Sequence, residues 1–422
     1  MPHPRARCYM KYLLLLAGLL GLAVSAGAAP TVSVQMRVIP ATHSFVCRYT
    51  MALAADDTAT TLDLNLGRQL RIENLLSSGS KPPRATRVYY PYFGDTLQQV
   101  VARFNGRARM VSVTYSGTLE GRLFNEQVMV FSGHSGWLPF RPYREYEAVN
   151  YVLEVQAPDG YQVESTSSAV EQRAGRWLFR GRAGAIEITA LVARQFQQLA
   201  SAGTPGIRVV KAGPALARTD TVLLRKAERI IAYYNRSIGQ QDPITQFTIL
   251  LPGTNADAFG LLENATVITY TDFDVATDRE ALLILAHEIS HKWWGYGSVH
   301  NYNDWLNEAF ATYSSLLFLR EDGDEAGYRA ELAKRVATVG DAPPIRGFDY
   351  QKYPRPVYRR VVYNKGTRVL AALHERLGTA PFVRLLATVA AGHVSNTDTL
   401  LEIVAQTSGP ATRAWLLAEL SR

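Results

Sequence analysis

The chain has 422 residues, of which 47% are hydrophobic and 19% charged, and its formal net charge at pH 7 is +8. Because its lysines and arginines are scattered and form no run, this composition argues against a nucleic-acid-binding protein. Only two cysteines occur, and since Cys8 falls in a leader, Cys47 has no partner for an internal disulfide.

Residues 1–28 are predicted to be a secretory signal peptide. Basic residues up to Lys11 precede an apolar run from Tyr12 to Val24, and the small residues Ala26 and Ala28 offer cleavage sites. The run is shorter than the roughly 20 residues that a transmembrane helix needs. We therefore expect an exported protein, periplasmic or secreted, without a stable membrane anchor once the signal has been removed.

Residues 29–200 are expected to form an N-terminal antiparallel β-sandwich. Leu62, Leu64 and Leu66 alternate with polar residues, as half-buried strands do, and the sequence APDG at 157–160 is a turn signal. Short strands separated by glycine and proline are typical of such a sandwich. The stretch SAGTPG at residues 201–206 is then expected to connect this domain to the next.

Residues 204–422 are expected to form a second domain of mixed α/β type. Apolar residues recur at helical spacing through 223–234, and the sequence TQFTILLP at residues 245–252 is expected to be a strand bounded by Pro252. A further helix is predicted to begin near Thr277, whose spacing from Glu280 is that of a capping box. An asparagine or aspartate at 303–304 can cap the helix after that. The whole chain is thus predicted to be an α+β multidomain protein.

The sequence HEISH at residues 287–291 indicates a metal site. His287 and His291 lie one helical turn apart, so they project from one face and can share a zinc ion. Glu288 can reach a water on that metal and act as general base. Glu308 lies in an apolar helix, where an unpaired carboxylate is costly, so it is the simplest third ligand. The alternative for HExxH alone is a chance match on a helix face.

HEISHKWWG followed by NDWLNEAFATY resembles the gluzincin zinc aminopeptidases, the group of aminopeptidase N and leukotriene hydrolase–aminopeptidase. Their signature places eighteen residues between HExxH and the glutamate ligand, whereas sixteen separate His291 from Glu308 here. A loop can absorb the difference, which falls in the turn GSVHNYND. The resemblance implies an N-terminal β-domain, a thermolysin-like zinc metallopeptidase domain with one Zn2+ per chain, and a compact form without the C-terminal helical domain of larger members.

Two further motifs carry the resemblance. FGLLEN resembles the family's G-x-M-E-N motif with Leu262 in place of methionine, which implies that Gly260, Glu263 and Asn264 bind substrate on an edge strand. In the family, the glutamate of this motif holds the free α-amine. VVYNKGTRVL resembles the Y-x-K-G segment, which implies that Tyr363 stabilises the oxyanion.

Taken together, these residues predict an exported zinc aminopeptidase that removes the first residue from peptides with a free N-terminal amine. Two alternatives remain: a zinc endopeptidase or non-peptide hydrolase without preference for that amine, and a catalytically silent peptide-binding or assembly protein. Trp293, Trp294, Tyr358 and His300 are assigned to packing or to the rim of the cleft.

Overall fold

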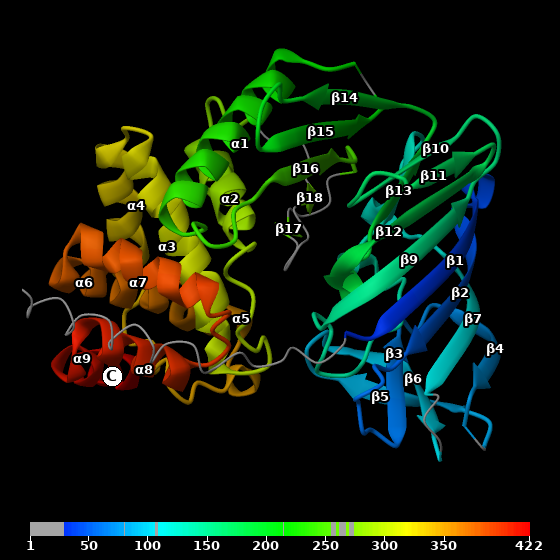
Figure 1. The fold of residues 1–422 in the computed structure, drawn as a ribbon, viewed down its shortest axis with the longest axis horizontal. Helices are drawn as coiled ribbons and strands as arrows, with labels where there is room; N and C mark the ends of the chain where they lie inside the picture. The colour runs from blue at the N-terminus through cyan, green and yellow to red at the C-terminus, as the bar shows by residue number, and fades with distance from the viewer. Residues whose placement is uncertain are drawn as a thin grey trace, which may run out of the picture.

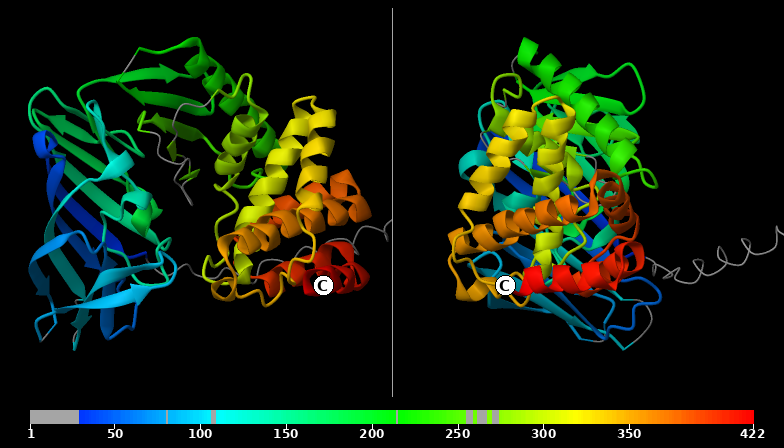
Figure 2. Two further views of the ribbon diagram at one scale, coloured as in Figure 1. Left: turned by 180° about the vertical axis from the view of Figure 1, so that it is seen from behind. Right: turned by 90° about the vertical axis from the view of Figure 1, so that its left-hand side faces the viewer.

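The computed structural model describes residues 29–422 apart from residues 80, 106–108, 214, 255–258, 261–266 and 270–273. The predicted signal peptide lies outside the described residues. Within them, a β-rich unit precedes a unit made of a mixed sheet and helices, and the two units lie side by side (Figures 1 and 2). The α+β architecture predicted from the sequence is therefore confirmed.

A seven-stranded sheet forms one layer of the N-terminal unit. Its strands, in sheet order, are β11 (Glu171–Arg173), β12 (Arg176–Gly184), β9 (Ala148–Gln156), β1 (Thr31–Ile39), β2 (Ser44–Ala52), β7 (Met110–Thr118) and β4 (Arg71–Ser77). Every second residue of β1 and β2 is buried, because successive side chains of a strand point to opposite faces of the sheet.

Two smaller sheets form the opposite layer. Their strands, in sheet order, are β3 (Thr61–Leu66), β6 (Asp95–Arg103) and β5 (Arg84–Tyr90), and β10 (Gln162–Ser165), β13 (Ala190–Ala193) and β8 (Val128–Phe131). Leu62, Leu64 and Leu66 are buried in the same core as the seven-stranded sheet, as their alternation predicted. The two layers thus form the expected sandwich.

One pair of strands departs from the expected antiparallel pattern. β1 pairs with β9 in parallel, from Thr31 opposite Asn150 to Arg37 opposite Gln156. A parallel pair needs a long connection between its strands, and here the chain from β2 to β8 supplies it. Alternation of residues along each strand shows which face is buried but not the direction of the neighbouring strand.

The sheet of the second unit has five strands, in the order β14 (Phe196–Ala200), β15 (Gly206–Ala212), β16 (Gln246–Leu251), β18 (Val267–Thr269) and β17 (Phe259–Gly260). β14 and β15 form an antiparallel hairpin. The stretch at 201–206, expected to connect two domains, is therefore a hairpin turn leading into β15. The sequence indicated where β14 lies but not which strand it pairs with, so the expected boundary at residue 200 divides this hairpin.

Helices make up most of the second unit. They are α1 (Arg218–Ser237), α2 (Arg279–Ser290), α3 (Trp305–Glu321), α4 (Glu325–Ala337), α5 (Arg355–Arg359), α6 (Gly366–Leu377), α7 (Thr379–Ala391), α8 (Thr397–Ser408) and α9 (Pro410–Ser421). α1 buries one apolar face, whereas α3 is buried almost all round and lies at the centre of the helical core. No helix in the described part of the chain is both long and apolar enough to span a membrane.

The cap of α2 differs from the expected one by a single residue. The side chain of Asp278 accepts a hydrogen bond from the backbone N–H of Glu280, so Asp278 is the N-cap. The hydroxyl of Thr277 instead donates to Asp274, 2.6 Å away. Aspartate and threonine both cap helices well, and the sequence alone did not separate two adjacent candidates.

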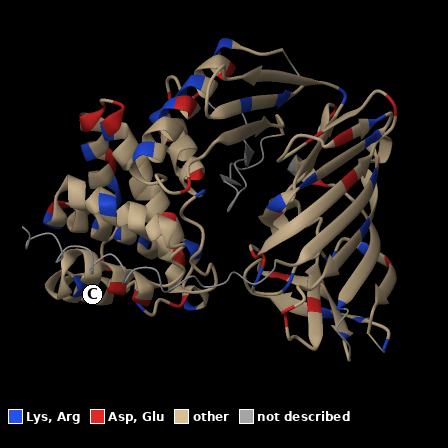
Figure 3. Cartoon of the chain, viewed as in Figure 1, with Lys and Arg blue, Asp and Glu red and all other residues tan. Residues whose placement is uncertain are grey.

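A small apolar cluster joins the two units. Its buried side chains come from β8 and β13 of the N-terminal unit and from β15 and β16 of the second unit: Val128, Val130, Leu191, Ala193, Val210, Ala212 and Leu250. Over both units, acidic and basic residues are interspersed along the chain in the view of Figure 3.

Candidate active site

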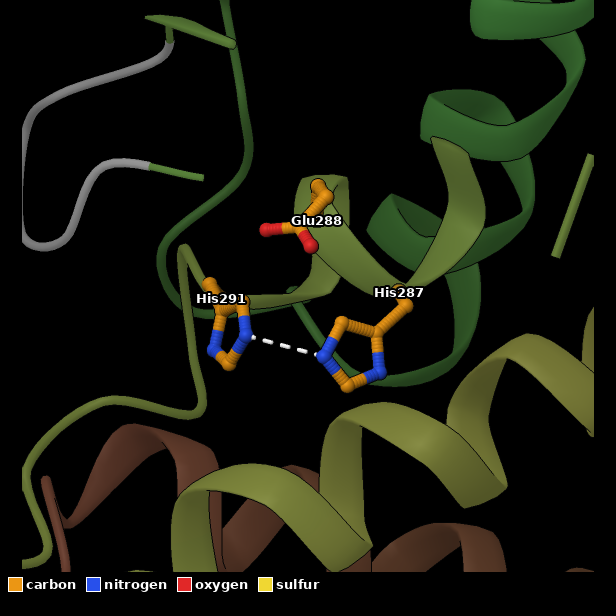
Figure 4. Close-up of side chains that lie close together, drawn as sticks. All are labelled: His287, Glu288 and His291. Atoms are coloured by element: carbon orange, nitrogen blue, oxygen red, sulfur yellow. Dashed lines mark hydrogen bonds between the residues drawn. The ribbon is translucent and has the colours of Figure 1, made fainter. Parts of the chain in front are cut away.

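Helix α2 carries the two histidines to the interior of the second unit. Its apolar face packs in the helical core, and His287 lies beside α3, with its Nδ1 3.4 Å from the Thr312 hydroxyl. Nε2 of His287 lies 3.1 Å from Nε2 of His291 (Figure 4). One metal-ligating atom from each of His287, Glu288 and His291 lies within 4.8 Å of the others.

The backbone fixes the tautomer of His291. Nδ1 of this ring lies 2.6 Å from the carbonyl oxygen of Trp294, and a carbonyl only accepts, so Nδ1 carries the proton and donates. Nε2 of the neutral ring is then left with its lone pair, which is directed at Nε2 of His287. Orientation of a ligating histidine through its second nitrogen is usual in metal sites.

Glu308 on α3 completes the cluster. Its Oε2 lies 3.2 Å from Nε2 of His287 and 3.9 Å from Nε2 of His291. This oxygen is buried and has no well-aligned hydrogen-bond donor among the described residues. Burial raises the pKa of Glu308, but the two histidines beside it outweigh that effect and hold the pKa well below its usual value.

These three atoms fit a single zinc ion. Ligand atoms on a tetrahedral zinc at about 2.1 Å lie roughly 3.4 Å apart, which is close to the observed separations. Two imidazoles and one ionised carboxylate are also a ligand set that zinc takes at catalytic sites. A buried carboxylate oxygen without a donor further indicates that a cation belongs there.

The short turn before α3 is held in place by Asn307. Its side-chain oxygen accepts from the backbone N–H of Gly297, and its side-chain nitrogen donates to the Gly297 carbonyl, both at 2.8 Å. A Cβ at Gly297 would lie only 2.4 Å from the carbonyl oxygen of Asn303, so a side chain there would collide with the backbone. The loop thus absorbs the shorter spacing between His291 and Glu308 and still leaves Glu308 beside the histidines.

Tyr363 reaches the cluster from a widened helical turn. Residues Arg360–Lys365 form the π-helix η7, which continues α5 into α6. Such turns are rare and are frequent at functional sites. The Tyr363 ring lies 6.2 Å from the His287 ring, with 9° between their planes, and its side chain is close enough to Glu308 for each group to act on the pKa of the other. Burial and the Glu308 charge raise the pKa of Tyr363, so its hydroxyl keeps its proton.

Two neighbours of Tyr363 in the sequence fix this turn. The ammonium group of Lys365 donates to the backbone oxygens of Ala342 at 2.8 Å and Pro343 at 2.9 Å. At Gly366, an added Cβ would lie 2.4 Å from Cβ of Ala309, the residue after Glu308. The glycine therefore lets α6 approach α3 closely at the level of the cluster.

A second acidic group, which the sequence did not single out, lies beside Glu308. Asp304 is 3% exposed, accepts from the side chain of Asn307 at 2.7 Å, and accepts from the Tyr358 hydroxyl. Burial and the negative charge of Glu308 raise the pKa of Asp304. The sequence assigned Tyr358 to packing or the rim, and offered Asp304 only as a helix cap. Asp304 does occupy the N-cap position, but without a capping hydrogen bond.

The N-terminal unit contacts the turn before α3 through a hydrogen bond between Glu145 and His300. Nε2 of His300 donates to Glu145, which is 1% exposed, at 2.8 Å, and the Tyr90 hydroxyl donates to the other oxygen of that carboxylate. The rings of Tyr92 and Tyr143 each lie 5.0 Å from the His300 ring. Aromatic residues of the sandwich thus surround His300, which the sequence assigned to packing or the rim.

The remaining predicted residues are placed only in part. Gly260 lies in β17, the last strand of the five-stranded sheet, antiparallel to β18. β17 contacts α2, the helix of the histidines. Glu263 and Asn264 lie outside the described residues. Trp293 and Trp294 are buried, and their indole nitrogens donate to the Asp242 carbonyl and the Ser314 hydroxyl respectively, as packing residues do.

Comparison with known proteins identifies the second unit. Residues 223–410 match the family described as "Peptidase family M1 domain". The second unit is thus similar to the peptidase family M1 domain over these residues. Among curated proteins, endoplasmic reticulum aminopeptidase 2 of Bos taurus is 24% identical over 215 residues, and aminopeptidase M1-A of Oryza sativa subsp. japonica is 28% identical over 148 residues. These alignments cover 46% and 31% of this chain but only 22% and 17% of the relatives' own length.

Solved structures with an M1 fold extend the likeness to nearly the whole chain. An M1 zinc metallopeptidase from Deinococcus radiodurans has a TM-score of 0.69 at 17% identity, with 94% of this chain and 93% of that chain covered. Native yeast LTA4 hydrolase has a TM-score of 0.72 at 14% identity, with 93% of this chain and 66% of that chain covered. The M1 domain and the preceding sandwich therefore share the fold of a two-domain M1 enzyme.

Proposed function

We propose that this protein is a zinc aminopeptidase. The observation that carries the proposal is the convergence of His287, His291 and Glu308, with a buried carboxylate oxygen that lacks a donor and a tyrosine hydroxyl beside it. We propose His287, His291 and Glu308 as ligands of one Zn2+. When bound, zinc would polarise the scissile carbonyl and acidify the attacking water.

Glu288 is proposed as the general base. It follows His287 on α2, and its carboxylate lies on the histidine side of the helix (Figure 4). A carboxylate in that position can accept a proton from the attacking water and deliver it to the leaving amine. The positioning of that carboxylate depends on α2, whose apolar face is fixed in the core.

Tyr363 is proposed to donate a hydrogen bond to the oxyanion. Its hydroxyl lies beside Glu308 and keeps its proton, because burial and the charge of that carboxylate raise the pKa of Tyr363. A donor that is held in place before the reaction stabilises developing charge without reorganisation. The position of Tyr363 is fixed by the π-helix η7, by the hydrogen bonds of Lys365 and by the close approach of Gly366 to α3.

Selection of the first residue is proposed to come from β17 and the residues after it. β17 is the terminal strand of its sheet and antiparallel to β18, so its outer edge suits an extended peptide. Gly260 would lie along that peptide, and Glu263 and Asn264 would bind its free amine. A Deinococcus radiodurans M1 zinc metallopeptidase variant has been solved with a Tyr-Ser-Ala substrate, and related structures contain L-tryptophan and L-arginine.

The test is hydrolysis of aminoacyl p-nitroanilides by purified protein with equimolar zinc, each substrate offered with a free and an N-acetylated amine. We expect cleavage of the free-amine set only, loss of activity with a chelator, and recovery with zinc. Glu308→Gln should abolish zinc retention and activity. Glu321→Gln, at the exposed end of the same helix, is the matched control and should change neither.

The outcomes separate the alternatives. Cleavage of both sets would indicate an endopeptidase or a less selective hydrolase, and would remove the proposed role of Glu263. Zinc binding without cleavage of either set would favour a silent peptide-binding protein. Failure to retain zinc at all would overturn the proposed ligand set.

We also propose that the protein is exported to the periplasm or the medium. The support is the charge and hydropathy pattern of residues 1–28, which has the layout of a signal peptide. Cell fractionation followed by N-terminal sequencing would test this. A protein recovered in the cytoplasm with residues 1–28 intact would contradict it.

A further inference from the structure

A cavity of about 510 Å³ opens between helices α3, α4 and α6 and the start of α7. The other three helices each contact α6 (Figure 1). Leu332 of α4 and Ala371 of α6 are among the residues that give the cavity apolar walls. Among the described residues that line it, none belongs to the proposed zinc site. Cavities of this size with apolar walls and a few polar groups are typical of small-molecule sites.

Four side chains that line the cavity form one chain of hydrogen bonds. The hydroxyl of Tyr313 lies 3.3 Å from the Tyr328 hydroxyl and 2.8 Å from Nδ1 of His374. Nε2 of His374 lies 3.1 Å from the Thr379 hydroxyl. Tyr313 and His374 are buried, and the His374 ring is stacked on Phe382 with 4.5 Å between the ring centres. The inner part of this chain is therefore fixed by the core.

The chain of hydrogen bonds leaves one donor over. Burial lowers the pKa of His374 to about 4, so at neutral pH its ring carries a single N–H. Three hydroxyls and this N–H supply four hydrogens, whereas the three contacts use three. Because the buried Tyr313 hydroxyl must donate within the chain, the remaining hydrogen lies at one end, on Tyr328 or on Thr379. Both ends line the cavity, so the cavity presents a free hydroxyl donor in either case.

Two arginines of the same cavity have no ion-pair partner among the described residues. The guanidinium carbon of Arg320, near the end of α3, lies 5.3 Å from the centre of the Tyr328 ring, and Arg368 comes from α6. Both arginines are partly buried. The lining also contains Glu375, which is exposed and forms no ion pair with either arginine in the described part of the chain. Guanidinium groups beside a neutral donor favour a carboxylate ligand.

We propose that this cavity binds a carboxylic acid with an apolar body. The carboxylate accepts hydrogen bonds from Arg320, Arg368 and the free hydroxyl of the chain, and the apolar body lies between Leu332 and Ala371. Free amino acids and other small organic acids share this chemistry. The inference goes beyond the proposed peptidase function and does not depend on it, because the cavity is lined by other residues than the zinc site.

The test is calorimetric titration of the zinc-containing protein at pH 7 with 3-phenylpropionate and with its neutral amide. We expect the acid to bind about tenfold more tightly than the amide, because the amide loses a charged hydrogen bond. Arg320→Gln and Arg368→Gln should each weaken binding of the acid about tenfold and leave the amide unchanged. Arg384→Gln, an exposed arginine of α7 outside the cavity lining, is the matched control and should change neither.

Two further titrations identify the site and the source of the ligand. A carboxylate can also bind zinc, so the titration is repeated after zinc has been removed with a chelator, and binding should persist. L-phenylalanine is then compared with 3-phenylpropionate. Tighter binding of L-phenylalanine that is lost in Glu375→Gln would assign the cavity to free amino acids, whereas weaker binding would assign it to acids without an amine.

Three results would each overturn the proposal. Equal binding of the acid and the amide would show that the cavity does not recognise a carboxylate. Unchanged binding of the acid in both Arg320→Gln and Arg368→Gln would show that these arginines do not contact it. Loss of all binding on removal of zinc would place the ligand at the metal instead of in the cavity.

Discussion

Lys365→Met tests whether the turn that carries Tyr363 depends on one buried ammonium group. Lys365 is 3% exposed, and its ammonium donates to three backbone oxygens, those of Ala342, Pro343 and Arg422, at 2.6 to 2.9 Å. Hydrogen bonds to a charged group contribute about 1.5–3 kcal/mol each, but burial of the ammonium costs several kcal/mol in return. Methionine fills a similar volume and leaves the three oxygens without this donor.

We expect the free energy of unfolding to fall by about 3 kcal/mol, since each oxygen left unpaired costs about 1–3 kcal/mol and the added apolar burial offsets part of the loss. Urea denaturation at pH 7, followed by tryptophan fluorescence, measures it. Lys352→Met is the matched control: Lys352 is exposed and pairs with Asp349 at 3.3 Å, so its removal should cost less than ~1 kcal/mol.

The same variant has a second measurable effect. Lys365 lies two residues after Tyr363 in η7, so a loosened turn should lower kcat more than it raises KM. A loss of less than ~1 kcal/mol in Lys365→Met, within the range of ordinary surface changes, would refute the reasoning that these three bonds hold the turn.

Three further predictions follow from the packing. In Gly366→Ala, the new Cβ lies 2.4 Å from Cβ of Ala309, so the free energy of unfolding should fall by about 1–3 kcal/mol, seen as a lower melting temperature, and zinc affinity should weaken. Gly203→Ala is the control, and it should change neither because the space around Gly203 is open. Glu145→Ala leaves His300 without its partner across the two units, so the free energy of unfolding, measured by urea denaturation, should fall by about 2–4 kcal/mol. A fall of less than ~0.5 kcal/mol would mean that the contact is not formed in solution. Burial lowers the pKa of His374 from 6.5 to about 4, so between those values the unfolded chain binds a proton that the folded chain does not. Stability should therefore fall as the pH drops from 6.5 toward 4, and less steeply in His374→Gln, as urea midpoints across that range would show.

Local features of the site were predictable from the sequence, because a helix fixes the relation of nearby residues. His287 and His291 lie on one face of α2 as their spacing required. The position of Glu308 depended on a turn shorter than in the family, and the spacing alone did not reveal how that turn closes. The two hydrogen bonds between Asn307 and Gly297 close it, and the sequence gives no pattern for such a pair.

Long-range partners were not predictable, because local geometry relates only residues that are near one another in the sequence. The hairpin of β14 with β15, the parallel pairing of β1 with β9 and the contact of Asp304 with Tyr358 all join residues whose closeness results from the complete fold. Patterns along the chain thus indicated which residues are buried, whereas the structure showed which residues meet.

The apolar cluster between the units bears on the order in which the chain folds during synthesis. Val130 and Leu191 belong to strands made early, but the side chains that cover them, Val210 and Leu250, emerge from the ribosome later. The N-terminal sandwich therefore exposes this apolar surface to solvent until β16 has been synthesised. A fragment ending near residue 200 should consequently self-associate through this apolar face.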